Sequence, residues 1–375
     1  MNYRKDIDGL RTLALIPVIL FHAGFESFAG GYVGVDIFFV ISGYLITSII
    51  LREQSAGTFS LITFYERRAR RILPALFLVM LLSLIFAWGL LLPHELKAFG
   101  ESMIAVITFA SNFLFWQESG YFATESEFIP LLHTWSLAVE EQFYIFFPLL
   151  LMLLWRFSKT YLAVVLGIIA LLSLGIAEWG WRTFPEANFY LIPSRAWELM
   201  IGALVAFFLF YRTQAQGILA HLGSLVGLAL LIYSILYIDK SLPFPSFYTL
   251  APTIGTALII LFTHKNTLVY QLLSTRLMVG IGLISYSAYL WHFPLLVFAK
   301  IYMLDELSLT LAGLLSGLAL LFGYISWRFI ERPFRDKHTF TRKQIFTMAG
   351  LVGLLLIAIG FALSISNGAE FRYAS

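Results

Sequence analysis

Residues 73–92, LPALFLVMLLSLIFAWGLLL, form a long stretch without a charged side chain. A helix of about 20 apolar residues is what crosses the hydrocarbon core of a bilayer. Directly before it, residues 65–74 read YERRARRILP and bring four arginines together. Dense positive charge beside an apolar stretch is typical of the cytoplasmic end of a spanning helix. The stretch therefore predicts a membrane-spanning helix that begins on the cytoplasmic side.

The composition of the whole chain supports the same class of protein. Its 375 residues are 59% hydrophobic and only 13% charged, against about 25% charged in soluble domains. So few charges cannot cover a soluble protein, which excludes an ordinary globular enzyme, a disordered chain and a nucleic-acid binder. The absence of cysteine excludes disulfides, zinc–thiolate sites, iron–sulfur clusters and a cysteine nucleophile. We predict an all-α integral membrane protein.

Eleven apolar stretches are long enough to span a membrane. They cover residues 10–27, 34–51, 73–92, 135–155, 161–179, 194–211, 219–238, 248–263, 279–299, 308–327 and 345–365. A twelfth stretch, 99–117, carries Glu101, Asn112 and Gln117 and is a span, a re-entrant segment or a surface helix.

The basic residues decide the orientation. With a cytoplasmic N-terminus and eleven spans, most of the 25 Lys and Arg residues lie on the cytoplasmic side. Counting 99–117 as a span would put the basic segment 328–343 outside. We therefore expect 99–117 to lie outside the cytoplasm and the C-terminus to be periplasmic. The polar segment 366–372 fits a lead-out toward a further soluble domain.

The first predicted span carries two ionisable residues, Arg11 and His22. Their spacing corresponds to about 1,100°, roughly 20° past three full turns, so both lie on one helix face about 16 Å apart along the axis. Charged groups inside a membrane usually face a partner or a cavity. The alternative is an arginine that reaches lipid phosphate and a histidine that is hydrogen-bonded in the bundle.

Asp36 begins the second span, at the level of His22. A carboxylate beside a histidine fixes the tautomer of the ring and raises its basicity. The alternative role is a helix N-terminal carboxylate that the helix dipole favours.

Polar residues also gather at the outer end of the fourth span. His133, Ser136 and Glu140 have the residue types of a hydrolase triad, but no G-x-S-x-G sequence surrounds the serine. We therefore interpret them, together with Glu141, as the polar lining of an outer cavity.

Two later spans carry polar groups at helical spacing. Arg195 and Glu198 are three residues apart, which permits an ion pair, and the pair either is structural or faces the outer cavity. Tyr289 and His292 continue a polar face that starts at Ser285.

The basic clusters on the cytoplasmic side have two interpretations. Arginine side chains suit phosphate, so the clusters fit a polyphosphate ligand. Topology and anionic lipid headgroups explain them equally well. The candidate ligands are Arg67, Arg68, Arg70, Arg71, Arg332 and Arg335, with Glu331 placed to orient one of the arginines.

A series of motifs, in this order along the chain, resembles the acyltransferase-3 family of membrane acyltransferases. They are the Arg11–His22 pair after DGLR at 8–11, FFVISGYL at 38–45, the arginine run at 67–71, WSLAVEEQFY at 135–144, RAWEL at 195–199, SYSAYLWHFP at 285–294 and IERP at 330–333. The resemblance implies a ten-helix bundle over 1–335, a linker and an eleventh spanning helix over 336–366, and a periplasmic lead-out over 367–375. In many bacterial members that lead-out continues into an SGNH domain.

The resemblance also implies an activity in the bacterial inner membrane. Acetyl groups from cytoplasmic acetyl-CoA would pass to a hydroxyl of an extracytoplasmic carbohydrate such as O-antigen, a lipid-linked or surface polysaccharide. His22 would act as general base or as transient acyl carrier, with Arg11 and Asp36 beside it. The acceptor would meet His133, Ser136, Glu140, Glu141, Arg195, Glu198, Tyr289 and His292, and the basic clusters would hold the CoA phosphates. No metal is expected. The alternative is a transporter of a small anionic or sugar solute, since carriers also need many spans and polar midplane residues.

Overall fold

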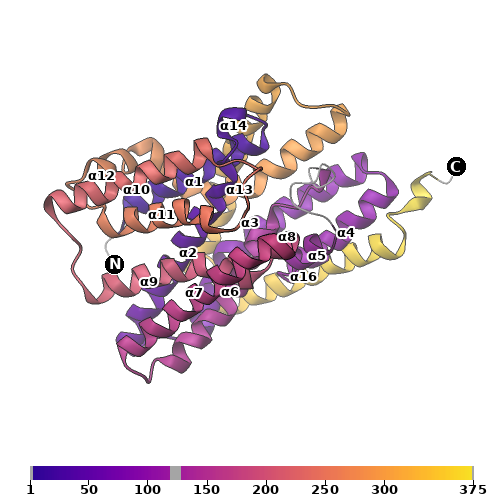
Figure 1. The fold of residues 1–375 in the computed structure, drawn as a ribbon. Helices are drawn as coiled ribbons and strands as arrows, with labels where there is room; N and C mark the ends of the chain where they lie inside the picture. The colour runs from indigo at the N-terminus through magenta and orange to yellow at the C-terminus, as the bar shows by residue number, and fades with distance from the viewer. Residues whose placement is uncertain (1–2, 119–127, 374–375) are drawn as a thin grey trace. The chain divides into compact units, whose positions relative to one another are not determined.

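The computed structural model describes residues 3–118 and 128–373, and every element in these ranges is helical (Figure 1). Nine helices of the described residues are long and apolar enough to cross a membrane. They are α2 (Gly34–Ser55), α3 (Leu61–Leu90), α6 (Thr134–Leu154), α7 (Lys159–Thr183), α9 (Ile192–Tyr211), α10 (Gly217–Tyr237), α13 (Arg276–Met303), α14 (Leu309–Ser326) and α16 (Arg342–Ile365).

The other two predicted spans, 10–27 and 248–263, are also helices, but they are not among these nine. Helix α1 (Lys5–His22) has 18 residues but carries Lys5, Asp6, Asp8 and Arg11. Helix α11 (Leu250–Phe262) has only 13 residues. The first span was predicted over 10–27, whereas α1 begins and ends earlier in the chain, so Arg11 lies near its middle and His22 is its last residue.

The stretch 99–117 divides into two helices. Helix α4 (Pro93–Ile107) has 15 residues and α5 (Ser111–Glu118) has eight. Phe109 between them has φ of 53°, a left-handed conformation that ends α4. Helix α4 lies along α16, where Ser364 Oγ donates to Glu101 Oε1 at 2.9 Å (Figure 1). The break explains why neither piece is long enough to be counted as a span.

The chain forms two compact units. Unit 1 comprises residues 1–59 and 139–285, and unit 2 comprises residues 60–138 and 286–375. The first boundary therefore falls between α2 and α3, and the other two fall within α6 and α13. Unit 1 also contains η1 (Glu26–Phe28), η2 (Gly31–Val33), α8 (Pro185–Tyr190), η4 (Phe247–Thr249) and α12 (Leu268–Leu273). Unit 2 also contains η5 (Trp327–Glu331), α15 (Arg332–Arg335) and η6 (Glu370–Tyr373).

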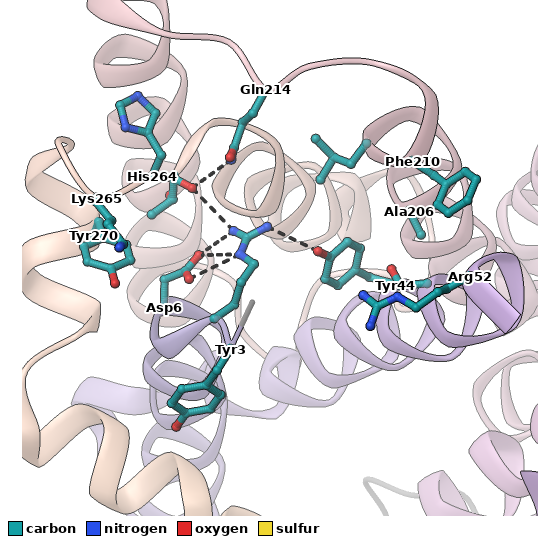
Figure 2. Close-up of a pocket in the computed structure, with 14 residues that line it drawn as sticks. Tyr3, Asp6, Tyr44, Arg52, Ala206, Phe210, Gln214, His264, Lys265 and Tyr270 are labelled. Atoms are coloured by element: carbon teal, nitrogen blue, oxygen red, sulfur yellow. Dashed lines mark hydrogen bonds and ion pairs between the residues drawn. The ribbon is translucent and has the colours of Figure 1, made fainter. Parts of the chain in front are cut away.

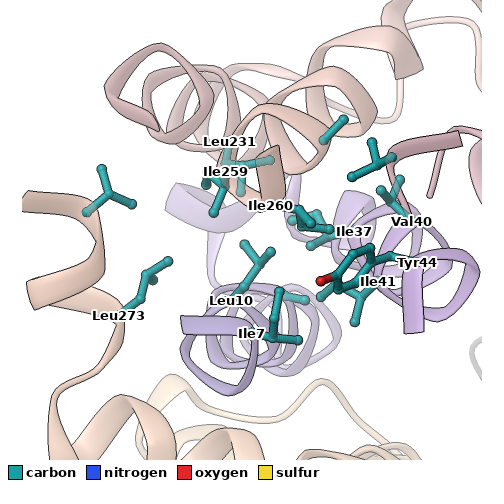
Figure 3. Packing of buried hydrophobic residues seen from close by; sticks show 14 of the residues in the cluster. Ile7, Leu10, Ile37, Val40, Ile41, Tyr44, Leu231, Ile259, Ile260 and Leu273 are labelled. Carbon is teal, nitrogen blue, oxygen red and sulfur yellow. The ribbon is translucent and has the colours of Figure 1, made fainter. Parts of the chain in front are cut away.

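The core of unit 1 is an aliphatic cluster between α1, α2 and the helices α9 to α12. Leu10 of α1 meets Ile37 of α2 and Ile259 of α11 there, and all three side chains are fully buried (Figure 3). Tyr44 of α2 lies at the edge of the cluster. The packing fixes the N-terminal half of α1 against α2, and with it the positions of Arg11 and Asp36.

Glycines bring α2 and α9 into backbone contact. A Cβ on Gly43 would lie 1.9 Å from the Leu199 carbonyl oxygen, and a Cβ on Gly202 would lie 2.1 Å from the Val40 carbonyl oxygen. Small residues at crossing points are how membrane helices approach closely. Because the same two helices also meet near their first turns, through Asp36 and Arg195, they run side by side in the same direction.

Unit 2 contains one irregular turn that matters for its polar groups. Residues Trp327–Glu331 form a π-helical turn, η5, between α14 and α15. Glu331 ends this turn, is 2% exposed, and accepts a hydrogen bond from Ser287 Oγ at 3.1 Å. Such wide turns are frequent at functional sites.

Candidate functional site

A fully buried charge cluster joins α2 and α9 in unit 1. Arg195 Nη1 lies 2.9 Å from Asp36 Oδ1 and 3.1 Å from Glu198 Oε1. The three side chains are at most 1% exposed. The Arg195–Glu198 ion pair confirms the interaction that their spacing predicts. We refer to Asp36, Arg195 and Glu198 as the Asp36 cluster.

Aromatic rings enclose the guanidinium of this cluster. Its carbon lies 4.8 Å from the ring centre of Phe189 and 5.1 Å from that of Phe244, which are cation–π distances. Arg195 Nε also donates to the Phe189 carbonyl oxygen at 2.9 Å. The arginine is therefore held from three directions and keeps a single orientation.

A series of ring contacts leads from this cluster toward the end of α1. Phe244 packs edge-on against Tyr32 at 4.8 Å, Tyr32 lies 5.3 Å from Phe21, and Phe21 lies 5.0 Å from the ring of His22. The imidazole of His22 is half-buried, as is the side chain of Arg11. Asp36, which we expected beside His22, has Arg195 as the ion-pair partner of its Oδ1.

The remaining acidic residues of α6 are placed differently from each other. Glu140 accepts hydrogen bonds from Ser42 Oγ at 2.9 Å and from Tyr144 OH at 3.1 Å. Glu141 is 6% exposed. Both carboxyl oxygens of Glu140 therefore have hydroxyl donors.

Unit 2 brings four of the predicted acceptor residues together. Ser136 Oγ lies 2.8 Å from Tyr289 OH, and Tyr289 OH donates to the His133 carbonyl oxygen at 2.9 Å. The rings of His133 and His292 are 5.6 Å apart, and both side chains are buried. The sequence placed these residues on two separate spans, and the structure brings them into one polar group.

The two histidines of this group are bound differently. His292 Nδ1 is bonded to the Tyr289 carbonyl oxygen of its own helix. Burial, together with the neighbouring His292, lowers the pKa of His133 well below its usual value. His133 is therefore neutral at neutral pH and suits hydrogen bonding to a hydroxyl better than binding an anion.

The arginine run lies inside α3, because that helix begins at Leu61. Arg70 is 2% exposed and is bound by Glu66 at 2.9 Å. Its guanidinium also donates to the carbonyl oxygens of Phe334 at 3.1 Å and Phe340 at 2.7 Å. Arg342 Nε donates to Glu66 at 2.6 Å. We refer to Glu66, Arg70 and Arg342 as the Glu66 cluster; it joins α3 to α15, to the segment after α15 and to the first residue of α16.

The other predicted phosphate ligands have different surroundings. Glu331 pairs with Arg335 at 3.1 Å, so it does orient one arginine of its cluster. Arg332 is exposed and lies over the Trp327 ring at 6.0 Å. The side chains of Arg67, Arg68 and Arg71 are half-buried on α3.

Residues 4–328 match the acyltransferase domain of the acyltransferase-3 family. The chain belongs to the acyltransferase-3 family. Two relatives, both named O-acetyltransferase OatA, come from Staphylococcus aureus. The protein of strain MRSA252 is 32% identical over 377 residues, which cover 95% of this chain and 62% of the relative. The protein of strain NCTC 8325 / PS 47 is 32% identical over 351 residues, which cover 90% of this chain and 58% of the relative.

This acyltransferase-3 chain thus spans about three fifths of the length of these relatives. No solved structure matches it. Within residues 3–118 and 128–373, no group of three or more His, Asp or Glu side chains is arranged to hold a metal ion.

Several partners in the acyltransferase-3 structure were not identified from the sequence. Glu66 and Arg342 are 276 residues apart, and Ser42 and Glu140 are 98 apart. Helical spacing relates residues within one turn or two, so it carries no signal for such pairs. The motif FFVISGYL contains Ser42, but nothing in it indicates that Ser42 bonds a carboxylate.

Proposed function

We propose that this protein transfers an acetyl group from cytoplasmic acetyl-CoA to a hydroxyl of an extracytoplasmic carbohydrate, in the inner membrane of a bacterium. The observation that carries this proposal is the acyltransferase domain over residues 4–328. The two relatives named O-acetyltransferase support an acetyl group and an oxygen acceptor.

His22 is the proposed centre of the chemistry. As a general base, its imidazole takes the proton of the acceptor hydroxyl while the oxygen attacks the thioester carbonyl. The carbon–sulfur bond then breaks, the protonated imidazole returns its proton to the sulfur, and coenzyme A leaves as the thiol. As an acyl carrier, His22 attacks the thioester itself, and the hydroxyl removes the acetyl group from the imidazole in a second step.

The Asp36 cluster is proposed to support the acceptor side of the reaction. Asp36 and Glu198 together bring two carboxyl groups to one guanidinium, and the ring contacts through Tyr32 connect this cluster to α1. We propose that Arg11 positions the thioester end of the donor. In unit 2, the hydroxyls of Ser136 and Tyr289 are proposed hydrogen-bonding partners of a sugar.

For the donor, the arginine run and the IERP motif are proposed phosphate ligands. Arg70 is the exception in that set, because Glu66 and backbone carbonyl groups already surround its guanidinium. The proposal therefore rests on Arg67, Arg68, Arg71 and Arg332.

The test is substitution of His22. We expect His22→Ala to abolish acetyl transfer to a carbohydrate acceptor and release of coenzyme A thiol, because a positioned base contributes about 10²- to 10⁴-fold and a lost acyl carrier stops the reaction. The protein should still fold, because His22 is the last residue of α1. The matched control is His94→Ala, an exposed histidine of α4.

Full activity in His22→Ala contradicts this mechanism. The two roles of His22 are separated by mixing the purified protein with radiolabelled acetyl-CoA in the absence of acceptor. Label that stays on the wild-type protein after rapid gel filtration at neutral pH, where an acyl-imidazole is hydrolysed more slowly than in acid, but not on His22→Ala, supports the acyl carrier. Label on neither protein supports the general base.

A further inference from the structure

One pocket in unit 1 is lined by none of the candidate site residues described above. It occupies the end of the unit where α1 begins and where α2, α9 and α11 end, and its cavity volume is about 460 Å³ (Figure 2). Small-molecule sites typically have about 300 to 1,000 Å³. With the predicted orientation of the chain, this end faces the cytoplasm.

The floor of the pocket is a rigid, neutral ion pair. Arg4 is bonded to Asp6 and donates to Tyr44 OH at 3.3 Å (Figure 2). It also donates to the Ile260 carbonyl oxygen at 3.0 Å. Burial alone would lower the pKa of Arg4, but the bond and the charge of Asp6 raise it above its ordinary value. Arg4 thus stays charged and is matched by Asp6, so the floor adds no net charge.

The walls, in contrast, carry positive charge without an acid. Arg52 in the last turn of α2 and Lys265 after α11 line the pocket, and both side chains are exposed. Among the residues drawn in Figure 2, neither makes a hydrogen bond or an ion pair, and the two lie on opposite sides of the Arg4–Asp6 pair. The pocket therefore offers two separated cations to a ligand.

Aromatic rings line the space between these cations. Tyr44 and Phe210 lie on the Arg52 side, and Tyr270 lies beside Lys265 (Figure 2). Phe210 is 39% exposed. Flat rings stack on nucleobases, with about 1 to 3 kcal/mol for each stacked base. Arginine and lysine are the usual ligands of phosphate.

From this combination we infer that the pocket binds a nucleotide that carries phosphates at two positions. The 3′-phosphate and the 5′-diphosphate of coenzyme A have this arrangement, so the pocket would receive the nucleotide end of the acyl donor. This inference rests on the proposed function. It offers Arg52 and Lys265 as ligands of the donor phosphates in place of Arg67, Arg68 and Arg71, the candidates that the sequence supplies, and the test below decides between the two sets.

An anionic lipid headgroup shares the phosphate but not the rest of this chemistry. A glycerophospholipid has one phosphodiester and no flat ring in its headgroup, so it would use one cation and leave the aromatic residues without a contact. The volume and the two separated charges favour the nucleotide.

The test measures binding of adenosine 3′,5′-bisphosphate to the purified protein by calorimetry in detergent. We expect the double variant Arg52→Gln/Lys265→Gln to bind this nucleotide about 100-fold more weakly, since removing one charge-assisted hydrogen bond to phosphate reduces affinity about tenfold or more. The matched control is Arg156→Gln/Arg212→Gln, which removes two cations of unit 1 that do not line the pocket. The control should bind as the wild type does.

Kinetics give a readout that a merely structural effect would not produce. With acetyl-CoA as donor, the pocket variant should have a raised KM and an unchanged kcat, because it loses ground-state binding only. With acetyl-pantetheine, which lacks the nucleotide, the variant and the wild type should react equally well.

Two results would overturn the inference. In the first, the pocket variant keeps wild-type nucleotide affinity while Arg67→Gln/Arg68→Gln/Arg71→Gln loses it. In the second, nucleotide affinity is unchanged but the variant no longer retains phosphatidylglycerol in native mass spectrometry, which would make the pocket a lipid site. In both cases acetyl transfer by the wild type would leave the proposed function intact. If the wild type binds the nucleotide but transfers no acetyl group, the proposed function fails instead.

Discussion

The Asp36 cluster and the Glu66 cluster combine the same kinds of group in opposite proportions. The Asp36 cluster has two carboxyl groups and one guanidinium, and its side chains are at most 1% exposed. The Glu66 cluster has one carboxylate and two guanidiniums, and its Arg342 side chain is 48% exposed. Each cluster lies within its own unit.

This difference in composition makes the Asp36 cluster the candidate functional site and gives the Glu66 cluster a structural role. In the Glu66 cluster the single carboxylate is bonded by two arginines. Arg70 also binds backbone carbonyl groups, and Arg342 reaches solvent. In the Asp36 cluster the carboxyl groups outnumber the one cation, in a setting where unpaired charge is costly. We propose that this excess binds a proton or the hydroxyl of an acceptor.

The largest expected effect comes from removing the one cation of the Asp36 cluster. Arg195→Met leaves two buried carboxyl groups without a counter-charge, so we expect the free energy of unfolding to fall by about 3 to 5 kcal/mol. Denaturant unfolding in detergent, followed by tryptophan fluorescence, measures the change. Arg182→Met is the control, because Arg182 is 52% exposed and its pair with Glu178 should contribute less than about 1 kcal/mol.

A second variant tests whether the Asp36 cluster needs both of its carboxyl groups as charges. Asp36→Asn keeps the shape of the side chain and leaves Arg195 paired with Glu198, so its loss should stay below about 1.5 kcal/mol. If Asp36→Asn unfolds as easily as Arg195→Met, both acids are needed as charges, and the contrast between the two clusters is wrong.

An intermediate effect is expected from the helix contact beneath the Asp36 cluster. In Gly43→Ala, the new Cβ would meet the Leu199 carbonyl oxygen at 1.9 Å, so α2 and α9 must separate. We expect a loss of about 1 to 3 kcal/mol, the usual range for overpacking. Acetyl transfer should fall as well, because Asp36 and Arg195 are on the two helices that move apart.

The control for this contact is Gly175→Ala on α7, where nothing lies within 4 Å of the added Cβ. That change should be neutral or stabilising by up to about 1 kcal/mol, as alanine favours a helix over glycine. Equal unfolding midpoints for the two variants would show that the close approach of α2 and α9 does not hold the cluster together.

The smallest effect is expected at the exposed edge of the Glu66 cluster. Arg342→Gln removes a partner of Glu66 whose side chain is half exposed, while Arg70 stays in place, so we expect a loss below about 1 kcal/mol. The same unfolding assay detects it. If the free energy of unfolding falls as much as in Arg195→Met, the two clusters contribute equally to stability and the contrast between them is wrong.

The sequence predicted the helices and the local pairs well, because both follow from short-range periodicity. All eleven predicted spans correspond to helices, and the i,i+3 pair of Arg195 and Glu198 is present. The apolar stretch 99–117 was harder, since a single left-handed residue, Phe109, divides it and nothing in its apolar pattern marks that position.

Contacts between distant segments could not be predicted. Asp36 and Arg195 are 159 residues apart, and helical spacing does not indicate which spans meet. The same limit applies to Arg70, whose guanidinium is surrounded by carbonyl groups of residues 334–340. The orientation in the membrane, the donor, and the roles of His22 and Arg11 stay predictions.

The π-helical turn at Trp327–Glu331 affects how the sequence of this region aligns with that of a regular α-helix. A π turn accommodates one more residue than an α-helical turn, and one residue corresponds to a rotation of about 100° around the axis. Glu331 ends this turn, and in that position it accepts the hydrogen bond of Ser287. A gapless alignment with a regular helix would therefore assign the role of Glu331 to a neighbouring position, although the local amino-acid sequences would look equally similar.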